Sequence, residues 1–115
     1  MPMHEVALVG DLVDAAVEHA AGRPASLVHI RFASTIPEDV LRQAWQMLTT
    51  GTPLEHADLL ADPVAVRLAC DCGFDGVLEH DDVIGPGSVV CPSCSQLRSV
   101  PVTPELELLE VRSAP

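Results

Sequence analysis

The sequence predicts an α+β protein in which a small mixed β-sheet packs with two α-helices, and a further unit built around four cysteines is inserted late in the chain. Apolar residues recur at helical spacing in residues 5–21 and again in 37–49, and they predict the two helices. Residues 27–33, 57–69 and 105–112 are rich in alternating or β-branched apolar side chains and predict the strands. The cysteines fall between the last two of these strands, so the unit that contains them should interrupt the sheet.

The two predicted helices have recognisable ends and buried faces. In the first, an apolar stripe faces one side, acidic residues occupy the other, and Gly22 provides the stop. In the second, Thr35 and Glu38 have the spacing of a capping box at the helix start. The stripe of the first helix comprises Leu8, Leu12, Ala15, Ala16 and His19, with Val9, Val13 and Val17 widening it, and that of the second comprises Val40, Leu41, Ala44, Trp45 and Leu48.

The predicted strands differ in how they should be buried. The first alternates so that Val28, Ile30 and Phe32 share one face, which predicts that His29, on the other face, is exposed to solvent. The second strand is long, and we expect it to bend or break at Pro63, because proline cannot donate a hydrogen bond to a sheet ladder. The last strand must return to the same sheet after the cysteines.

The cysteines occur as two close pairs, Cys70-x-Cys72 and Cys91-x-x-Cys94, separated by a turn-rich loop of residues 73–90. Two short turns that each aim two thiolates at one point suit the tetrahedral shell of a structural zinc ion, so we expect a unit that resembles a zinc ribbon. Four thiolates leave no position for water, which argues against a hydrolytic zinc enzyme. Two alternatives stay open at this point: disulfide bonds, and a redox-active dithiol formed by Cys91 and Cys94.

The net charge of −11 restricts the functions that the chain can serve. Its six Lys and Arg residues, all of them arginine, are too few to form a face that binds a phosphate backbone, so we expect no binding to nucleic acid. No apolar segment approaches the roughly 18 residues of a membrane span, and no signal peptide opens the chain. We therefore expect a cytoplasmic protein that does not associate with membranes.

Several motifs occur together in a characteristic order. Met3-His4-Glu5 stands directly before the first amphipathic segment, and the second predicted helix leads into Thr50-Gly51-Thr52. The two cysteine pairs come late, and a short strand rich in Glu and Leu closes the chain. In this combination the sequence resembles the HypA/HybF family, the nickel metallochaperones of NiFe-hydrogenase maturation. The resemblance extends over about residues 3–112, and Met-His-Glu together with the paired cysteines is its most specific part.

This resemblance implies a carrier of nickel rather than an enzyme. It implies that the cargo ion, Ni(II), binds at His4 with Glu5 beside it, and that the four cysteines hold Zn(II). It also implies two partners, a nickel-insertion GTPase and the hydrogenase large subunit, and in some organisms a role in urease maturation. We expect a discontinuous nickel-binding α/β body of residues 1–69 and 100–115, and a zinc-binding unit of residues 70–99. The alternative is a zinc-ribbon module for protein–protein interaction that carries no nickel.

The residues before the Met-His-Glu motif bear on how nickel is bound. Because proline is a small second residue, we expect the initiator methionine to be removed, so that the mature chain begins Pro2-Met3-His4. A histidine third from a free amine offers four nitrogens in one plane: the amine, the deprotonated backbone amides of Met3 and His4, and the imidazole. Ni(II) favours such square-planar nitrogen coordination. Two other possibilities stay open, a translation start at Met3 and a retained Met1 with binding by the His4 side chain alone.

Overall fold

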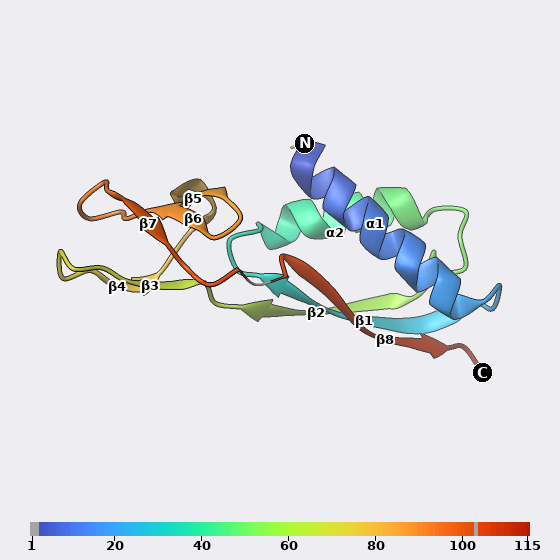
Figure 1. Ribbon diagram of the computed structural model, residues 1–115. Coiled ribbons are helices and arrows are strands. Elements are labelled where there is room, and N and C mark those ends of the chain that lie inside the picture. Colours follow the sequence, from blue (N-terminus) through green and yellow to red (C-terminus); the bar gives the residue numbers. More distant parts are fainter. Residues whose placement is uncertain (1–2, 103) are drawn as a thin grey trace.

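The protein is an elongated molecule of two lobes, seen in a computed structural model that describes residues 3–102 and 104–115. Its principal dimensions are 53 × 23 × 19 Å. Figure 1 shows a lobe with two helices, from which both ends of the chain emerge, and a lobe of short strands beside it. The residues expected to supply an amino-terminal amine, Met1 and Pro2, lie outside the described residues.

The helical lobe contains both helices and a three-stranded sheet. Its elements are α1 (Met3–Ala20), β1 (Ala25–Ala33), α2 (Glu38–Thr49), β2 (Asp58–Val64) and β8 (Leu106–Ser113). β1 lies in the centre of the sheet and pairs with β2 in parallel and with β8 in antiparallel orientation. Both helices cover one face of this sheet (Figure 1). The predicted α+β class with a mixed sheet is therefore confirmed.

The core of the helical lobe lies between the sheet and the helices. Val28, Ile30 and Phe32 of β1 are buried there, so the predicted inner face of this strand is confirmed. The stripe predicted for α1 is wrong at His19, which is exposed, and its buried centre includes Val9, which was expected only to widen the stripe. Apolar residues surround much of this helix, so the pattern did not fix the centre of its buried face. The remaining buried apolar residues on the helices are Leu12, Val13, Ala16, Ala20, Leu41, Ala44 and Trp45.

The predicted capping box at the start of α2 is wrong. This helix, which the structure describes in full, begins at Glu38 without a side-chain hydrogen bond to cap it. Glu38 does not reach back because its Oε2 accepts a hydrogen bond from Arg42 Nε, one turn later, at 2.9 Å. Thr35 is buried before the helix, where its carbonyl oxygen accepts a hydrogen bond from His80 in the second lobe.

The long strand predicted over residues 57–69 breaks after Val64 rather than at Pro63. Pro63 keeps its place in the register with β1, because β2 is an edge strand, where a missing N–H is tolerated. Ser34 instead determines where the chain leaves the sheet after β2. Its amide donates to the Val64 carbonyl at 2.8 Å, and its hydroxyl accepts a hydrogen bond from the Val66 amide at 3.3 Å.

The second lobe, residues 67–99, contains the four cysteines and is named the cysteine unit here. Its elements are β3 (Arg67–Ala69), β4 (Asp75–Val77), a 3-10 turn at His80–Asp82, β5 (Val83–Gly85), β6 (Ser88–Val90) and β7 (Leu97–Ser99). β3 pairs with β4, and β6 lies between β5 and β7. The sequence predicted only a loop between the cysteine pairs, because strands of this length are too short to show a period.

The two lobes have separate hydrophobic cores. Leu68 belongs to the core of the cysteine unit, so the chain joins this lobe shortly before Cys70. The division into a body of residues 1–69 and 100–115 and a unit of residues 70–99 stays a prediction about independent folding. Within the part of the chain that the structure describes, neither helix combines the length and the apolar character needed to cross a bilayer.

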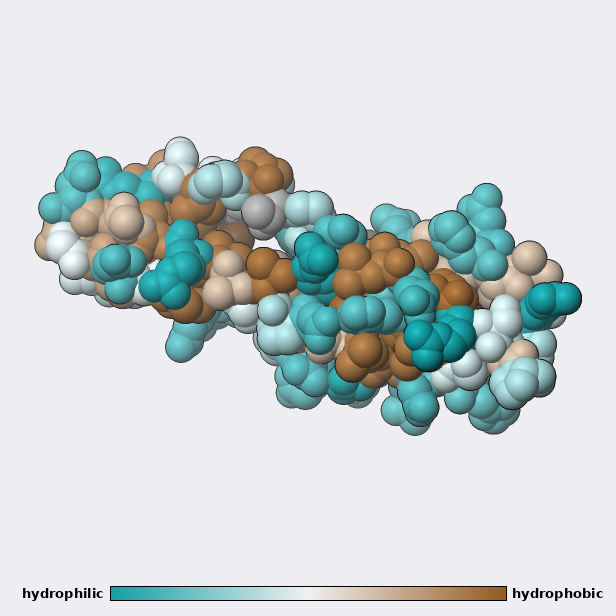
Figure 2. Space-filling view, turned by 90° about the horizontal axis from the view of Figure 1, so that it is seen from below, coloured by the Kyte–Doolittle hydropathy of each residue, from teal (hydrophilic) through white to brown (hydrophobic). Residues whose placement is uncertain are grey.

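The sheet face opposite the helices carries both polar and apolar side chains. Figure 2 views this side of the molecule and shows hydrophobic patches separated by hydrophilic residues. Leu60 on β2 and Leu109 on β8 are among the exposed apolar residues. His29 of β1 is partly exposed, and its Nε2 lies 2.6 Å from the Asp62 carboxylate of β2.

Candidate functional site

Two tight turns present the four cysteines. Cys70 follows β3, and its turn is closed by a hydrogen bond from the Gly73 amide to the Cys70 carbonyl oxygen at 3.0 Å. Gly73 has a φ of 102°, a conformation that glycine adopts without steric cost. Cys91 follows β6, and there the Ser95 amide donates to the Cys91 carbonyl oxygen at 2.9 Å. Each turn holds two cysteines at the end of a paired strand, and the turns face each other.

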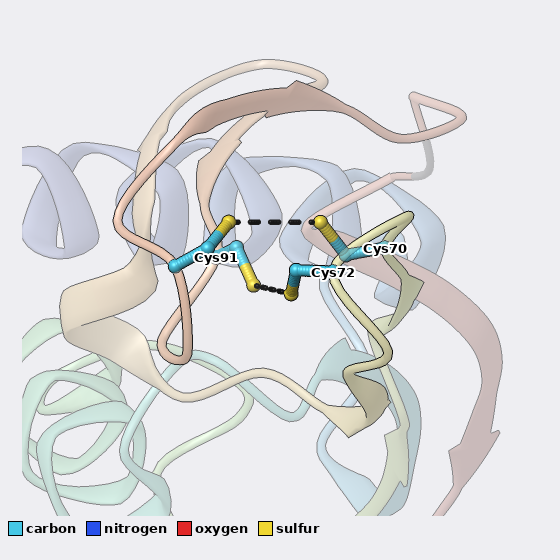
Figure 3. Close-up of side chains that lie close together, drawn as sticks. Cys70, Cys72 and Cys91 are labelled. Atoms are coloured by element: carbon cyan, nitrogen blue, oxygen red, sulfur yellow. Dashed lines mark hydrogen bonds between the residues drawn. The ribbon is translucent and has the colours of Figure 1, made fainter.

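The four sulfur atoms form a compact cluster, and all of them lie within 4.8 Å of one another. Sγ of Cys70 is 3.8 Å from Sγ of Cys94, and Sγ of Cys72 is 3.6 Å from Sγ of Cys91 (Figure 3). A tetrahedral zinc ion with Zn–S bonds of about 2.3 Å holds its sulfurs about 3.8 Å apart. All four cysteines are free, and their arrangement around one point favours a metal over pairwise disulfides. The donor set and its spacing therefore fit zinc, the short Cys70-x-Cys72 pair included.

The surroundings of the sulfurs favour a thiolate at Cys70. Hydrogen bonding by the Cys72 backbone amide and by Arg98 lowers the pKa of the Cys70 thiol to about 6. Arg98 approaches from β7, and its Nε donates to Cys70 Sγ at 3.1 Å. At Cys72 the Phe74 amide lowers the pKa, but desolvation and the neighbouring sulfurs outweigh it and raise the pKa to about 11. Each thiolate makes ionisation of the neighbouring thiols less favourable, so a bound cation is needed for all four to ionise at neutral pH.

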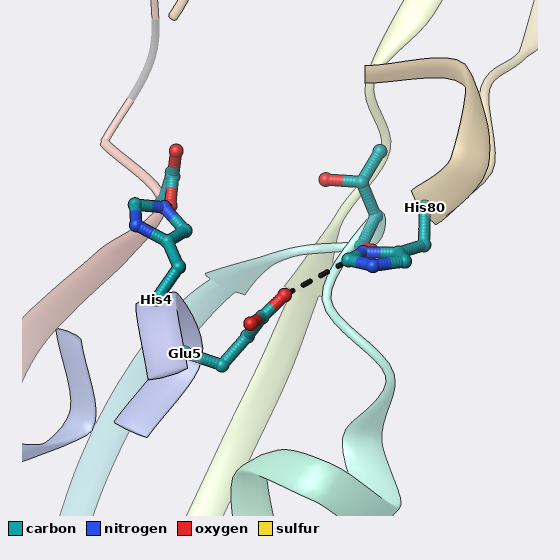
Figure 4. A network of polar contacts seen from close by, with 5 residues as sticks. His4, Glu5 and His80 are labelled. Atoms are coloured by element: carbon teal, nitrogen blue, oxygen red, sulfur yellow. Dashed lines mark hydrogen bonds and ion pairs between the residues drawn. The ribbon is translucent and has the colours of Figure 1, made fainter. Parts of the chain in front are cut away.

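The predicted nickel ligands, His4 and Glu5, lie in the first turn of α1, and their side chains point in different directions (Figure 4). The His4 side chain is 68% exposed, and its Nε2 lies 2.9 Å from Oε2 of Glu105. Glu5 is only 5% exposed. Its Oε1 lies 3.7 Å from Nδ1 of His80. The nearer partner of His80 is the Thr35 carbonyl oxygen, to which its Nδ1–H donates at 3.0 Å.

These side chains line a cleft of about 260 Å³ between the two lobes. His4, Glu5 and Glu105 reach it from the helical lobe, and His80 reaches it from the cysteine unit. Within residues 3–102 and 104–115, the one group of three or more His, Cys, Asp or Glu side chains with all its ligand atoms within 4.8 Å is the four cysteines. The structure therefore brings the four cysteines together, and it leaves His4 and Glu5 with separate partners.

No pattern in the sequence predicted that His80 and Glu105 lie in this cleft. Glu105 and His4 are 101 positions apart, and no local pattern connects such residues. One signal was present at Glu5, which shares the buried face of α1 with Val9 and Leu12. A carboxylate on a buried helix face requires a polar partner, although the sequence does not say which residue supplies it.

Comparison with known proteins identifies the family of this chain. The model of the family described as "Hydrogenase/urease nickel incorporation, metallochaperone, hypA" matches residues 3–112. The chain belongs to the HypA family. The resemblance based on Met-His-Glu and the paired cysteines is thus confirmed.

Similar proteins of this family come from archaea and bacteria. The hydrogenase maturation factor HypA of Methanothermobacter thermautotrophicus is 31% identical over 98 residues, which cover 80% of each chain. HypA of Chloroflexus aurantiacus is 32% identical over 101 residues, which cover 82% of this chain and 83% of that one. The solution structure of the Ni metallochaperone HypA from Helicobacter pylori has the same fold, with a TM-score of 0.58 at 22% identity over 95% of this chain and 96% of that chain.

Proposed function

We propose that this HypA-family chain is a nickel carrier that binds Ni(II) at the start of α1 through His4, with Glu5 beside it, and delivers the ion to a hydrogenase during maturation. The family is one of nickel incorporation into hydrogenase and urease. The assignment of the cargo site rests on the position of His4. Its imidazole is exposed in the first helical turn, at the edge of the cleft between the lobes.

The start of α1 offers nitrogen ligands besides the imidazole. The first four backbone amides of a helix have no intrahelical partner, and those of Met3 and His4 belong to this set. The imidazole, together with backbone amide nitrogens that release their protons on metal binding, suits Ni(II), which favours square-planar nitrogen and oxygen ligation. Glu5 and Glu105 add negative charge that attracts a cation to the cleft. If the mature chain begins at Pro2, the amine of Pro2 completes the plane of four nitrogens. That terminus stays a prediction.

The four cysteines bind the second metal of this proposal, a structural zinc ion. With thiolates of Cys70, Cys72, Cys91 and Cys94 in all four tetrahedral positions, zinc has no open position for a reacting water molecule. When bound, it offsets part of the negative charge of the thiolates and links the two turns that carry them. The protein is therefore proposed to act as a carrier and not as an enzyme.

The partners and location in this proposal rest on the family alone. They are a nickel-insertion GTPase, the hydrogenase large subunit as recipient, a further role in urease maturation, and a cytoplasmic location. Delivery requires that a recipient's ligands reach the metal. An exposed histidine in the first turn of a helix permits this, because a partner can approach it from the solvent side.

Metal stoichiometry tests the proposal directly. The full chain, purified with zinc, incubated with Ni(II) and desalted, should contain one zinc and one nickel, with the zinc content unchanged by nickel. A protein that keeps its zinc but binds nickel no more tightly than its His4→Ala variant would be an interaction module without cargo. Uptake of nickel with loss of an equal amount of zinc would place nickel at the cysteines and contradict the proposal.

Arg98 is expected to slow the loss of zinc. Its Nε–H bond to Cys70 Sγ, at 3.1 Å, puts a positive charge beside a cluster that stays negative when zinc is bound to four thiolates. Arg98→Gln should accelerate zinc transfer to a colorimetric chelator by about 10-fold or more. Arg67→Gln is the control, because Arg67 lies in the same unit and contacts Asp75 at 3.8 Å. Equal transfer rates in all three proteins would contradict this role.

A further inference from the structure

We infer that Glu105 is a positioning residue for the cargo site: it holds His4 by Nε2 and thereby leaves Nδ1 as the ring atom that binds nickel. The inference rests on the proposed nickel site at His4, to which it adds the residue that holds the imidazole. Its basis is the 2.9 Å contact between His4 Nε2 and Glu105 Oε2. Both residues line the cleft between the lobes.

The partner of Nε2 decides which ring nitrogen keeps a lone pair. An ionised carboxylate accepts hydrogen bonds and has no proton to donate, so His4 donates its Nε2–H to Glu105. A neutral imidazole carries a single N–H, and its other nitrogen, here Nδ1, keeps the lone pair that a metal needs. Glu105 thus selects the tautomer in which Nδ1 is ready to bind a metal.

Nδ1 is also the ring nitrogen with the right reach. Together with the backbone amide nitrogen of His4 itself, it closes a small chelate ring around a metal through Cα, Cβ and Cγ. Nε2 lies on the far side of the imidazole and does not contact an ion held in that position. A nickel ion bound by the first-turn amides therefore requires Nδ1, which is the atom that the contact with Glu105 leaves free.

Among the residues that the structure describes, His4 is the partner of the Glu105 carboxylate. Its backbone carbonyl oxygen accepts a hydrogen bond from the Ala33 amide at 2.9 Å, which ties it to the end of β1. The other carboxylate at the helix start, Glu5, turns toward His80 and does not compete for His4 (Figure 4). A metal-binding histidine commonly donates its second ring N–H to a carboxylate, which fixes the orientation of the ring and raises its basicity.

Glu105→Gln tests the inference with little change in side-chain size. Nickel affinity of the full, zinc-loaded chain should fall about 10- to 100-fold, while the far-ultraviolet circular dichroism stays that of the wild type. Long-range proton–nitrogen NMR of the nickel-free protein should show His4 as the Nε2–H tautomer in the wild type and as a mixture in the variant. Glu107→Gln, which removes the same charge from β8, should change neither property.

Two results would overturn the inference about Glu105 without contradicting the nickel site at His4. Wild-type nickel affinity in Glu105→Gln would do so whatever the tautomer, and weaker binding with an unchanged tautomer would show that Glu105 acts only through its charge. Failure of the proposed function has a different signature, which is a His4→Ala variant that binds nickel as tightly as the wild type. The inference would then fall with the site, even if the NMR spectra showed that Glu105 holds the ring.

Discussion

Cys91→Ser is expected to lose zinc and to unfold the cysteine unit, while the helical lobe stays folded. Cys91 is fully buried in the small core that it forms with Leu68, Leu78 and Val89. This core is too small to hold strands of three residues by itself. A structural zinc ion contributes on the order of 10 kcal/mol to the folding of a small metal-dependent unit, and the variant forfeits that contribution. The helical lobe is expected to survive because its larger core comes from other segments.

Hydrogen exchange resolved by segment checks this prediction. In the variant, the amides of β3 to β7 should exchange rapidly, while those of α1 and β1 keep their wild-type protection. Ser93→Ala is a matched control, because Ser93 is exposed between the two cysteines of the same turn. This variant should retain zinc and the wild-type protection of its amides from hydrogen exchange. Loss of protection throughout the chain would show that the two lobes do not fold independently, against the predicted division.

His4→Ala is expected to abolish tight nickel binding and to leave the zinc content unchanged. The substitution removes the proposed imidazole ligand, so the loss of affinity should exceed the about 10- to 100-fold that removal of an outer partner produces. Zinc should stay because its proposed ligands lie on the turns of the cysteine unit. Isothermal titration of the zinc-loaded protein with Ni(II) measures the change, and elemental analysis measures the zinc.

Two further proteins make the nickel titration specific. His19→Ala removes an exposed histidine from the same helix and should bind nickel as the wild type does. A chain acetylated at its amino terminus separates the amine from the imidazole. Loss of binding on acetylation as well as in His4→Ala would support joint coordination by both groups, and loss in His4→Ala alone would support a site formed by the side chain. Equal affinity in all of these proteins would contradict a nickel site at His4.

Patterns within single elements predicted most of the helical lobe. The alternation of Val28, Ile30 and Phe32 identified the inner face of the central strand, and the apolar stripes located both helices. The spacing of the cysteines likewise indicated a cluster that the structure forms. Each of these signals lies within a few neighbouring residues, where the periods of helices and strands and the reach of a tight turn leave few alternatives.

The errors arose where another part of the molecule competes with a local signal. The capping box at Thr35 failed because Glu38 pairs with Arg42. Pro63 did not break β2 because the strand lies at the edge of the sheet. The contact of His4 with Glu105 had no local signal at all, since it depends on how the chain returns to β1 after the cysteine unit.

X-ray absorption at the nickel and zinc edges, on one protein loaded with both metals, tests most directly whether the cargo ion is bound at His4 and zinc at the cysteines. The structure predicts a nickel edge with nitrogen and oxygen scatterers, and a zinc edge with four sulfurs at about 2.3 Å. Sulfur scattering at the nickel edge would contradict the account.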